Sequence, residues 1–295
     1  MAIRIGINPL TWTNDDLPAL GGRTPLATCL REARRAGFEG IEMGHKFPRV
    51  ASRLRPILAA HELALVSGWY SGRLLERSVA AEIKAVRDHL GLLAQLGSTV
   101  MVFAEVTGCV HGDRKTALSK RPRLGPRDWR DFGRALTEVA RHLEGRGVRM
   151  AYHHHMGTVV ETETDVDRLM AATGPTVGLL LDTGHLAFAR GNALRVVRKH
   201  GRRINHVHCK DVRRKILAQA RAGDWSFLDA VLAGAFTVPG DGDLDFTSTL
   251  AALKRRGYQG WLVVEAEQDP ATAHPMTSAR LGHSALNRIA ADLGW

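Results

Sequence analysis

Two short apolar runs that each end in polar side chains constrain the fold of this chain most strongly. The first runs from Val177 to Asp182 and continues to His185, and the second runs from Ile204 to Asp211. Apolar runs of this length indicate buried strands, and strands buried on both faces are typical of a parallel sheet covered by helices. Because ligands bind at the carboxyl ends of such strands, we expect a functional site at this edge.

Strand-like and amphipathic helix-like segments alternate along the whole chain. The expected strands cover residues 3–8, 38–43, 63–69, 99–105, 148–155, 177–182, 204–211 and 260–265. The expected helices cover residues 24–36, 48–60, 76–96, 128–144, 162–172, 186–200, 244–256 and 277–293. Gly37 follows the first helix, at the usual position of a helix stop. This alternation predicts an α/β fold, a single-domain (β/α)8 TIM barrel over residues 1–295.

Two segments interrupt the alternation. Residues 106–127 form a long loop rich in Gly, Pro and basic residues, directly after a strand. Loops of this length are often functional, so we expect a lid over the site, although an ordered surface loop or an oligomer contact fits as well. Residues 213–243 form an irregular insertion in which we expect one helix.

Composition limits the classes of protein that fit. The 295 residues are 44% hydrophobic and 24% charged, which allows one large core. Neither a membrane-spanning run nor a signal-like N-terminus is present, so we expect a cytoplasmic protein with no membrane partner. Cys29, Cys109 and Cys209 have no paired spacing, which argues against disulfides and CxxC metal sites. The net charge of +11 comes from scattered arginines, so we expect a solvated basic surface, no nucleic-acid partner and a possible homo-oligomer.

Candidate metal ligands follow four of the expected strands. His153, Asp182, His208 and Glu265 each lie near a carboxyl end, and alternation places His155 on the face of His153. Each residue alone could be an ordinary turn or cap residue, but four strand ends agree. Mixed imidazole and carboxylate ligands favour Mn2+, Co2+, Fe2+ or Zn2+ over Mg2+.

Other residues at the expected mouth of the barrel could have either a functional or a structural role. The indoles of Trp12 and Trp69 could stack on the apolar face of a sugar ring or could pack at the mouth. Lys210 shares a strand face with His208 and could act in the site, or it could be a structural cation that pairs with Glu42 or Glu105.

Several motifs together carry a family resemblance. AYHHHMG, LLLDTGH, VHCKD, VPGDGDLDF and VVEAEQDP resemble the xylose isomerase-like barrel superfamily of sugar isomerases, epimerases and dehydratases. Within this superfamily the chain is similar to inosose dehydratases, on the basis of INPLTWTNDD, EMGHKFP and VHGDRKTALSKRPRL. The similarity covers nearly the whole chain, and the SKRPRL and YHHHMGT stretches are the most discriminating.

The resemblance implies roles for particular residues. Asp182, His208 and Glu265 match the superfamily's metal ligands, whereas His153 stands where a Glu is usual. His155 and His185 fall where related enzymes contact substrate hydroxyls. The full set of substrate-binding residues that we expect is His185, Trp12, Trp69, Asn8 and Glu105.

The resemblance also implies an activity, the dehydration of 2-keto-myo-inositol (inosose) in inositol catabolism. The expected cofactor is a divalent metal, with Mn2+ or Co2+ ahead of Zn2+ or Fe2+. The metal would make the hydrogen beside the ketone acidic, and Lys210, His155 and Glu42 are the candidates for base and acid. A ketose isomerase or epimerase of the same barrel is the alternative. An abasic-site endonuclease of this fold would need additional ligands on the early strands.

Overall fold

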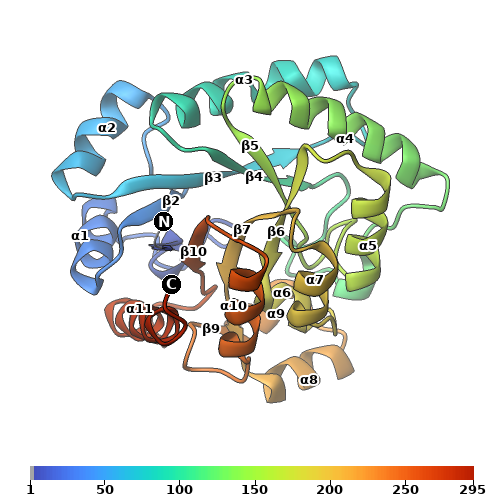
Figure 1. Cartoon of the computed structure of the whole chain (residues 1–295). Helices are drawn as coiled ribbons and strands as arrows, with labels where there is room; N and C mark the ends of the chain where they lie inside the picture. The colour runs from blue at the N-terminus through green and yellow to red at the C-terminus, as the bar shows by residue number, and fades with distance from the viewer. Residues whose placement is uncertain (1–2) are drawn as a thin grey trace.

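Eight parallel strands close into a barrel in the computed structural model, which describes residues 3–295 (Figure 1). They are β1 (Arg4–Ile7), β2 (Gly40–Met43), β3 (Ala64–Gly72), β4 (Val100–Glu105), β5 (Arg149–His153), β6 (Val177–Asp182), β7 (Ile204–Cys209) and β10 (Trp261–Val264). The barrel is closed by β1, where Ile7 pairs with Ile41 on one side and Val264 on the other. The predicted TIM-barrel fold is therefore confirmed; Met1 and Ala2 lie outside the described residues.

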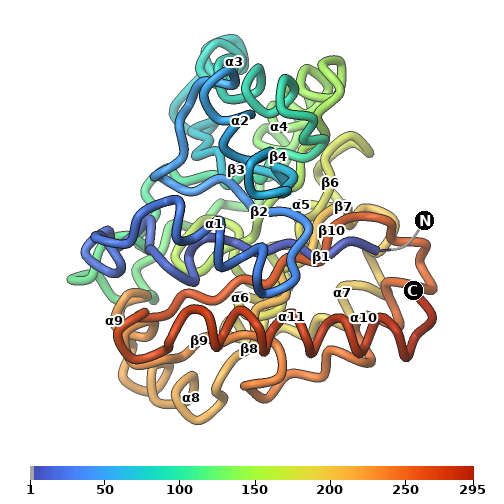
Figure 2. The backbone as a smooth tube through the Cα atoms, turned by 90° about the vertical axis from the view of Figure 1, so that its left-hand side faces the viewer, coloured from blue at the N-terminus to red at the C-terminus, as the bar shows by residue number. Residues whose placement is uncertain are grey.

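Helices surround the barrel and both chain ends lie at one end of it (Figures 1 and 2). The helices are α1 (Leu26–Ala36), α2 (Ala51–Ala60), α3 (Val79–Gln95), α4 (Asp128–Glu144), α5 (Glu163–Ala172), α6 (Thr183–Phe188), α7 (Ala193–His200), α8 (Arg214–Ala222), α9 (Phe227–Leu232), α10 (Phe246–Arg255) and α11 (Pro275–Asp292). Figure 2 shows α9 at the end away from the termini. Among the described residues, no helix is long and apolar enough to cross a membrane.

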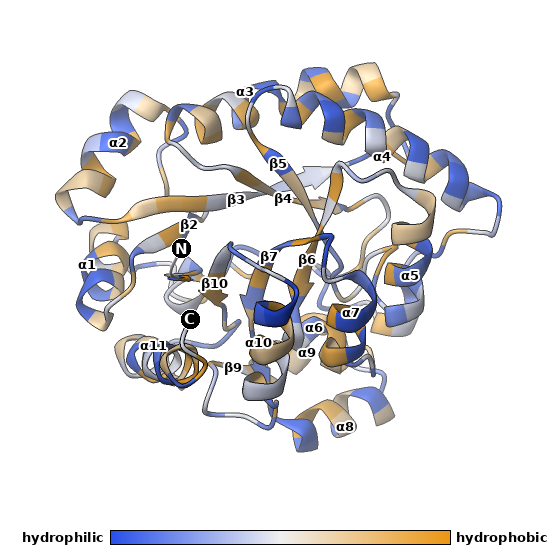
Figure 3. Cartoon of the chain, viewed as in Figure 1, coloured by the Kyte–Doolittle hydropathy of each residue, from blue (hydrophilic) through white to orange (hydrophobic). Residues whose placement is uncertain are grey.

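The core lies between the strands and the inward faces of the helices. Hydrophilic and hydrophobic stretches alternate along the outer helices, while the strands are mostly apolar (Figure 3). On α4, for example, Phe132, Leu136 and Leu143 are buried, as the helical spacing of apolar residues requires. Inside the barrel, the smaller side chains of Val102, Ala151 and Leu180 form a separate apolar cluster. This cluster forms an apolar layer inside the barrel.

Local signals define the helix ends. Thr162 and Asp165 form a reciprocal capping box at the start of α5. Gly37 ends α1 with φ of 106°, a left-handed conformation that residues with a Cβ rarely adopt, so the predicted stop is confirmed.

Several predicted boundaries were wrong; the seventh strand, for example, ends at Cys209 and not at Asp211. The single helix expected over residues 186–200 is two helices, because Asp182 caps α6 directly after its strand and the chain breaks at Arg190, whose φ is 62°. Asn192 then caps α7. The fifth strand ends at His153 and not at His155, since the backbone N–H of His155 donates to Val160 within a loop.

The two irregular segments pack together beside the carboxyl ends of the strands. The 106–127 loop contains a short 3-10 helix, η2 (Leu118–Lys120), and a second such helix, η1 (Pro9–Thr11), follows β1. The 213–243 insertion contains two helices instead of the expected one, and β8 (Asp211–Val212) pairs antiparallel with β9 (Phe236–Thr237). Leu118 of the loop shares a second apolar cluster with Phe227 and Phe236 of the insertion. The loop is therefore anchored by packing.

Candidate metal and substrate site

The four predicted metal ligands lie together at the carboxyl end of the barrel. His153 and Asp182 are the last residues of β5 and β6, His208 lies in β7, and Glu265 follows β10 directly. One ligand atom from each lies within 4.8 Å of the others, and all four side chains are buried. Neighbouring parallel strands end at the same edge, which is why residues far apart in sequence converge.

Asp182 uses its two carboxylate oxygens differently. Its Oδ1 accepts a hydrogen bond from the backbone N–H of His185 at 2.8 Å and so caps α6. Its Oδ2 is buried without a hydrogen-bond partner and lies 3.5 Å from His208 Nδ1. A buried carboxylate oxygen without a donor is costly unless a cation satisfies it.

The two histidines are oriented in the same manner, with one nitrogen fixed and one turned inward. His208 Nε2 lies 3.2 Å from Glu42 Oε2, while its Nδ1 lies 2.6 Å from Glu265 Oε2 without hydrogen-bond geometry. His153 Nδ1 donates to the carbonyl of His154 at 2.7 Å, which leaves Nε2 with a lone pair, 3.7 Å from Asp182. Outer partners of this kind fix the tautomer of a metal-binding imidazole.

Burial and neighbouring charges set the protonation of these ligands. Burial, reinforced by the charge of His208, holds the pKa of His153 well below its ordinary value, so its imidazole is neutral. Burial raises the pKa of Glu265, but His208 and Lys210 outweigh it and lower that pKa, which keeps the carboxylate ionised. These are the forms in which His153 and Glu265 would bind a divalent cation. Burial opposes the charge of His208, but Glu265 and Glu42 raise its pKa, so metal binding would displace a proton from His208.

Glu42 lies beneath this group and is saturated with donors. Its carboxylate accepts from Asn8 Nδ2 at 2.7 Å, from His206 Nε2 at 2.8 Å and from the Ser67 hydroxyl, and it also contacts His208. Burial opposes its ionisation, yet His208 and His206 hold the pKa of Glu42 well below its ordinary value. A carboxylate with this many donors has little basicity left, which suits orientation of His208 better than proton transfer.

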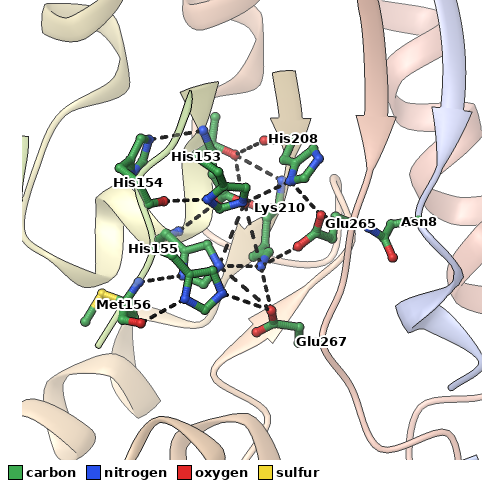
Figure 4. A network of polar contacts seen from close by, with 12 residues as sticks. Asn8, His153, His154, His155, Met156, His208, Lys210, Glu265 and Glu267 are labelled. Atoms are coloured by element: carbon green, nitrogen blue, oxygen red, sulfur yellow. Dashed lines mark hydrogen bonds and ion pairs between the residues drawn. The ribbon is translucent and has the colours of Figure 1, made fainter. Parts of the chain in front are cut away.

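Lys210 is fully buried among carboxylates, and these are not the two carboxylates that the sequence suggested as its partners. Its Nζ lies 2.8 Å from Glu265 Oε1, 3.1 Å from Glu267 Oε1 and 3.6 Å from Asp182 Oδ2, instead of pairing with Glu42 or Glu105 (Figure 4). Burial opposes the charge, but these carboxylates raise the pKa of Lys210. Lys210 is therefore an ammonium inside the site.

A second group of possible metal ligands adjoins the first. One of its members, Glu267, was not predicted from the sequence. His155, His185 and Glu267 each offer a ligand atom within 4.8 Å of the others. Lys210 Nζ lies 2.8 Å from His185 Nε2, so an ammonium already occupies the position a second cation would take. Glu267 lies two residues after Glu265, so alternation continued past the end of β10 could have identified it.

The tautomer of His155 is defined by its neighbours. His155 Nδ1 donates to the carbonyl of Met156 at 2.8 Å, so Nε2 carries the lone pair and lies 3.8 Å from Glu267 (Figure 4). The half-buried Trp69 contacts the rings of both His153 and His155 edge-on, at centroid distances of 5.4 and 5.6 Å. Trp69 and His155 therefore lie where they could contact a molecule bound at the four metal-ligand residues.

Two of the expected substrate-binding residues are engaged elsewhere. Trp12 is only 1% exposed, belongs to the main core, and donates its indole N–H to Glu32 at 2.7 Å. Glu105 accepts backbone N–H groups of Leu74 and Thr107 at 2.6 and 2.9 Å. Ordinary packing thus accounts for Trp12, and local hydrogen bonding accounts for Glu105.

The donor set fits a divalent cation. It combines two imidazole nitrogens and two carboxylates, and the inward atoms Asp182 Oδ2 and His208 Nδ1 have no hydrogen-bond partner. These buried groups could hold one metal ion, as expected from the strand ends.

Comparison with known proteins places this architecture in a family. The profile of the xylose isomerase-like TIM barrel family matches residues 30–289. The chain therefore belongs to the xylose isomerase-like TIM barrel family.

Relatives over nearly the full length narrow the resemblance. The rhizopine catabolism protein MocC of Rhizobium meliloti is 53% identical over 295 residues, which are 100% of this chain and 91% of that protein. The inosose dehydratase of Geobacillus thermodenitrificans (strain NG80-2) is 42% identical over 279 residues, 94% of each chain. These relatives confirm the predicted resemblance to inosose dehydratases. The chain is therefore an inosose dehydratase-like enzyme.

Solved structures support the fold. An L-ribulose 3-epimerase superposes with a TM-score of 0.70 at 18% identity, covering 99% of this chain and 96% of its own. The IOLI protein with a bound zinc atom gives a TM-score of 0.70 at 17% identity over 99% of both chains.

Proposed function

We propose that this protein dehydrates 2-keto-myo-inositol to a trihydroxycyclohexane-dione in inositol catabolism, with a divalent metal ion as cofactor. The proposal rests on one observation above all, the convergence of inward-facing donors from four strand ends, of which Asp182 Oδ2 and His208 Nδ1 lack partners. Full-length relatives that bear the name inosose dehydratase support the substrate.

The metal would be held by His153, Asp182, His208 and Glu265, and Mn2+ or Co2+ suits this mixed donor set, with Zn2+ or Fe2+ as substitutes. When bound, the ion supplies Lewis-acid stabilisation of the negative charge that develops on the ketone oxygen.

We assign the base to His155. Because its Nδ1 donates to Met156, its Nε2 lone pair is available to take the proton beside the ketone. Glu42, the other carboxylate considered for this step, is occupied by donors and positions His208.

Lys210 and the residues around it would bind and orient the polyol. Its ammonium lies against Glu265, Glu267 and His185, so it can hold an oxygen of the substrate close to these groups. Trp69, His185 and Asn8 remain proposed substrate contacts. Trp12 would act at most through packing, and Glu105 at most through its local hydrogen bonds. The substrate is neutral, so the basic part of the loop, from Lys115 to Arg123, would cover it by hydrogen bonding and not by charge.

An isomerase or epimerase acting on a ketose would use the same four ligands and the same proton abstraction without loss of water. We therefore test the proposal by incubating the metal-loaded protein with inosose and with several ketoses. Ultraviolet absorbance of the dione from inosose, without interconversion of the ketoses, is expected. Ketose interconversion without dione would favour the alternative.

An abasic-site endonuclease is disfavoured by the internal pairing of the neighbouring groups. A cluster of three metals would need free ligands, but Glu42 is saturated by donors and Lys210 occupies the group of His155, His185 and Glu267. Absence of nicking on abasic DNA is the expected result.

A further inference from the structure

The 106–127 loop delivers a histidine to the site that the proposed roles above do not use. His111 is 8% exposed, and its ring contacts those of His155 and Trp69 at centroid distances of 4.8 and 6.4 Å. Its Nδ1 is buried without a hydrogen-bond partner. A buried polar atom without a partner needs an explanation, and a substrate hydroxyl would supply one.

Asp16 in the loop after β1 faces the other nitrogen of this ring. His111 Nε2 lies 3.7 Å from Asp16 Oδ1, and the Asp16 side chain is 34% exposed. A carboxylate at this distance can orient the imidazole ring.

The backbone holds His111 in place by close approach to the loop that carries His155. The N–H of Val110 donates to the carbonyl of Gly157 at 2.9 Å. Gly157 has a φ of 76°, and a Cβ there would lie 2.8 Å from the backbone nitrogen of His111. Only glycine allows this approach without displacement.

A buried arginine fixes the far end of the same loop. Arg121 is 5% exposed, donates to Asp165 at 2.7 Å and to the carbonyl of Thr158 at 3.1 Å, and pairs with Glu161 at 3.2 Å. These contacts tie the loop to the segment that follows His155. The position of His111 relative to His155 is therefore set by the fold and not by a loose loop.

From this arrangement we infer that His111 is the catalytic acid that protonates the leaving hydroxyl, with Asp16 as its positioning residue. The inference rests on the proposed dehydration. As the bond from the β-carbon to oxygen breaks, the electron pair left at the α-carbon forms the new carbon–carbon double bond. The departing oxygen takes its proton from His111 and leaves as water. Between turnovers His111 Nδ1 regains a proton from solvent, and the base returns its proton to solvent.

Two measurements on one variant separate this role from a structural one. For metal-loaded His111→Gln we would follow dione formation from inosose, and in D2O the exchange of the proton beside the ketone. Dione formation is expected to fall about 10²–10⁴-fold, the usual contribution of a general acid, while exchange stays within a few-fold of wild type. Asp16→Asn should show the same pattern with a smaller loss.

Arg114→Gln is the matched control, since Arg114 lies in the same loop and its side chain is 60% exposed in an ion pair with Asp229. This control should leave both rates unchanged. Equal losses of exchange and dione formation in His111→Gln, or no loss of either, would contradict the role of His111 as the acid. Neither result would contradict the proposed dehydration. A wild-type protein that forms no dione would instead overturn the proposed function on which the inference rests.

Discussion

Asp182 caps a helix with one oxygen and presents the other to the site, because its Oδ1 accepts the backbone N–H of His185 at 2.8 Å. Asp182→Asn keeps an oxygen for this cap and removes the charge, whereas Asp182→Ala removes both. We expect both variants to lose bound metal, and the Ala variant to be less stable than the Asn variant by about 1 kcal/mol, the cost of a lost cap. Elemental analysis and urea unfolding measure the two effects. Wild-type metal content in Asp182→Asn would exclude Asp182 as a ligand.

Glu42 should control metal affinity through His208, whose Nε2 lies 3.2 Å from it. In Glu42→Gln we expect affinity for Mn2+ to fall by about 10–100-fold, as is typical when the outer partner of a ligand is lost. Turnover should return when the metal is raised to saturation. A rate that stays low at saturating metal would instead make Glu42 an acid or base.

Replacement of Lys210 should separate metal binding from turnover. Lys210→Met leaves Glu265 and Glu267 buried without their cation, so the metal-free protein should lose about 3–5 kcal/mol of unfolding free energy. Added metal should bind and restore part of this stability, while dione formation stays low. Unfolding in urea with and without chelator, combined with the activity assay, tests this. Full activity in Lys210→Met would reduce Lys210 to a structural cation.

His154 should make the fold sensitive to acid. Burial lowers its pKa from the ordinary value of 6.5 to about 4, and its Nε2 accepts the backbone N–H of Asp182. Between pH 4 and pH 6.5, His154 binds a proton in the unfolded chain but not in the folded chain. The stabilisation is thus complete above pH 6.5, and about 3 kcal/mol of it is lost as the pH falls to 4.

We would measure this loss by urea unfolding across that range, with chelator present throughout so that metal release does not contribute. His154→Gln removes the titrating group and should show a shallower dependence on pH. Identical slopes for the variant and the wild type would assign the acid sensitivity to other groups.

The barrel and the ligand group were predictable because both depend on local patterns. Each strand is an apolar run, and parallel strands deliver their terminal residues to one edge, which brings His153, Asp182, His208 and Glu265 together without knowledge of the packing. The helix break was less accessible, since Arg190 adopts a positive φ that its residue type does not suggest.

Contacts across the barrel interior could not be predicted in this way. Glu42 bonds His206 from a strand that is not its neighbour in the sheet, 164 residues away in sequence, so the pairing depends on the closed geometry. The same is true of His111, which reaches His155 only because a long loop folds back over Gly157. Such contacts come from tertiary packing, for which periodicity carries no signal.

The most direct test of the shared metal site is a titration of chelator-treated protein with Mn2+, Co2+, Zn2+ and Mg2+, in which dione formation from inosose and bound metal are read on the same sample. We expect no turnover without metal and full turnover as one equivalent of Mn2+ or Co2+ binds per chain, with Glu265→Ala neither binding nor turning over. Dione formation by metal-free protein, or by Glu265→Ala without bound metal, would contradict the account.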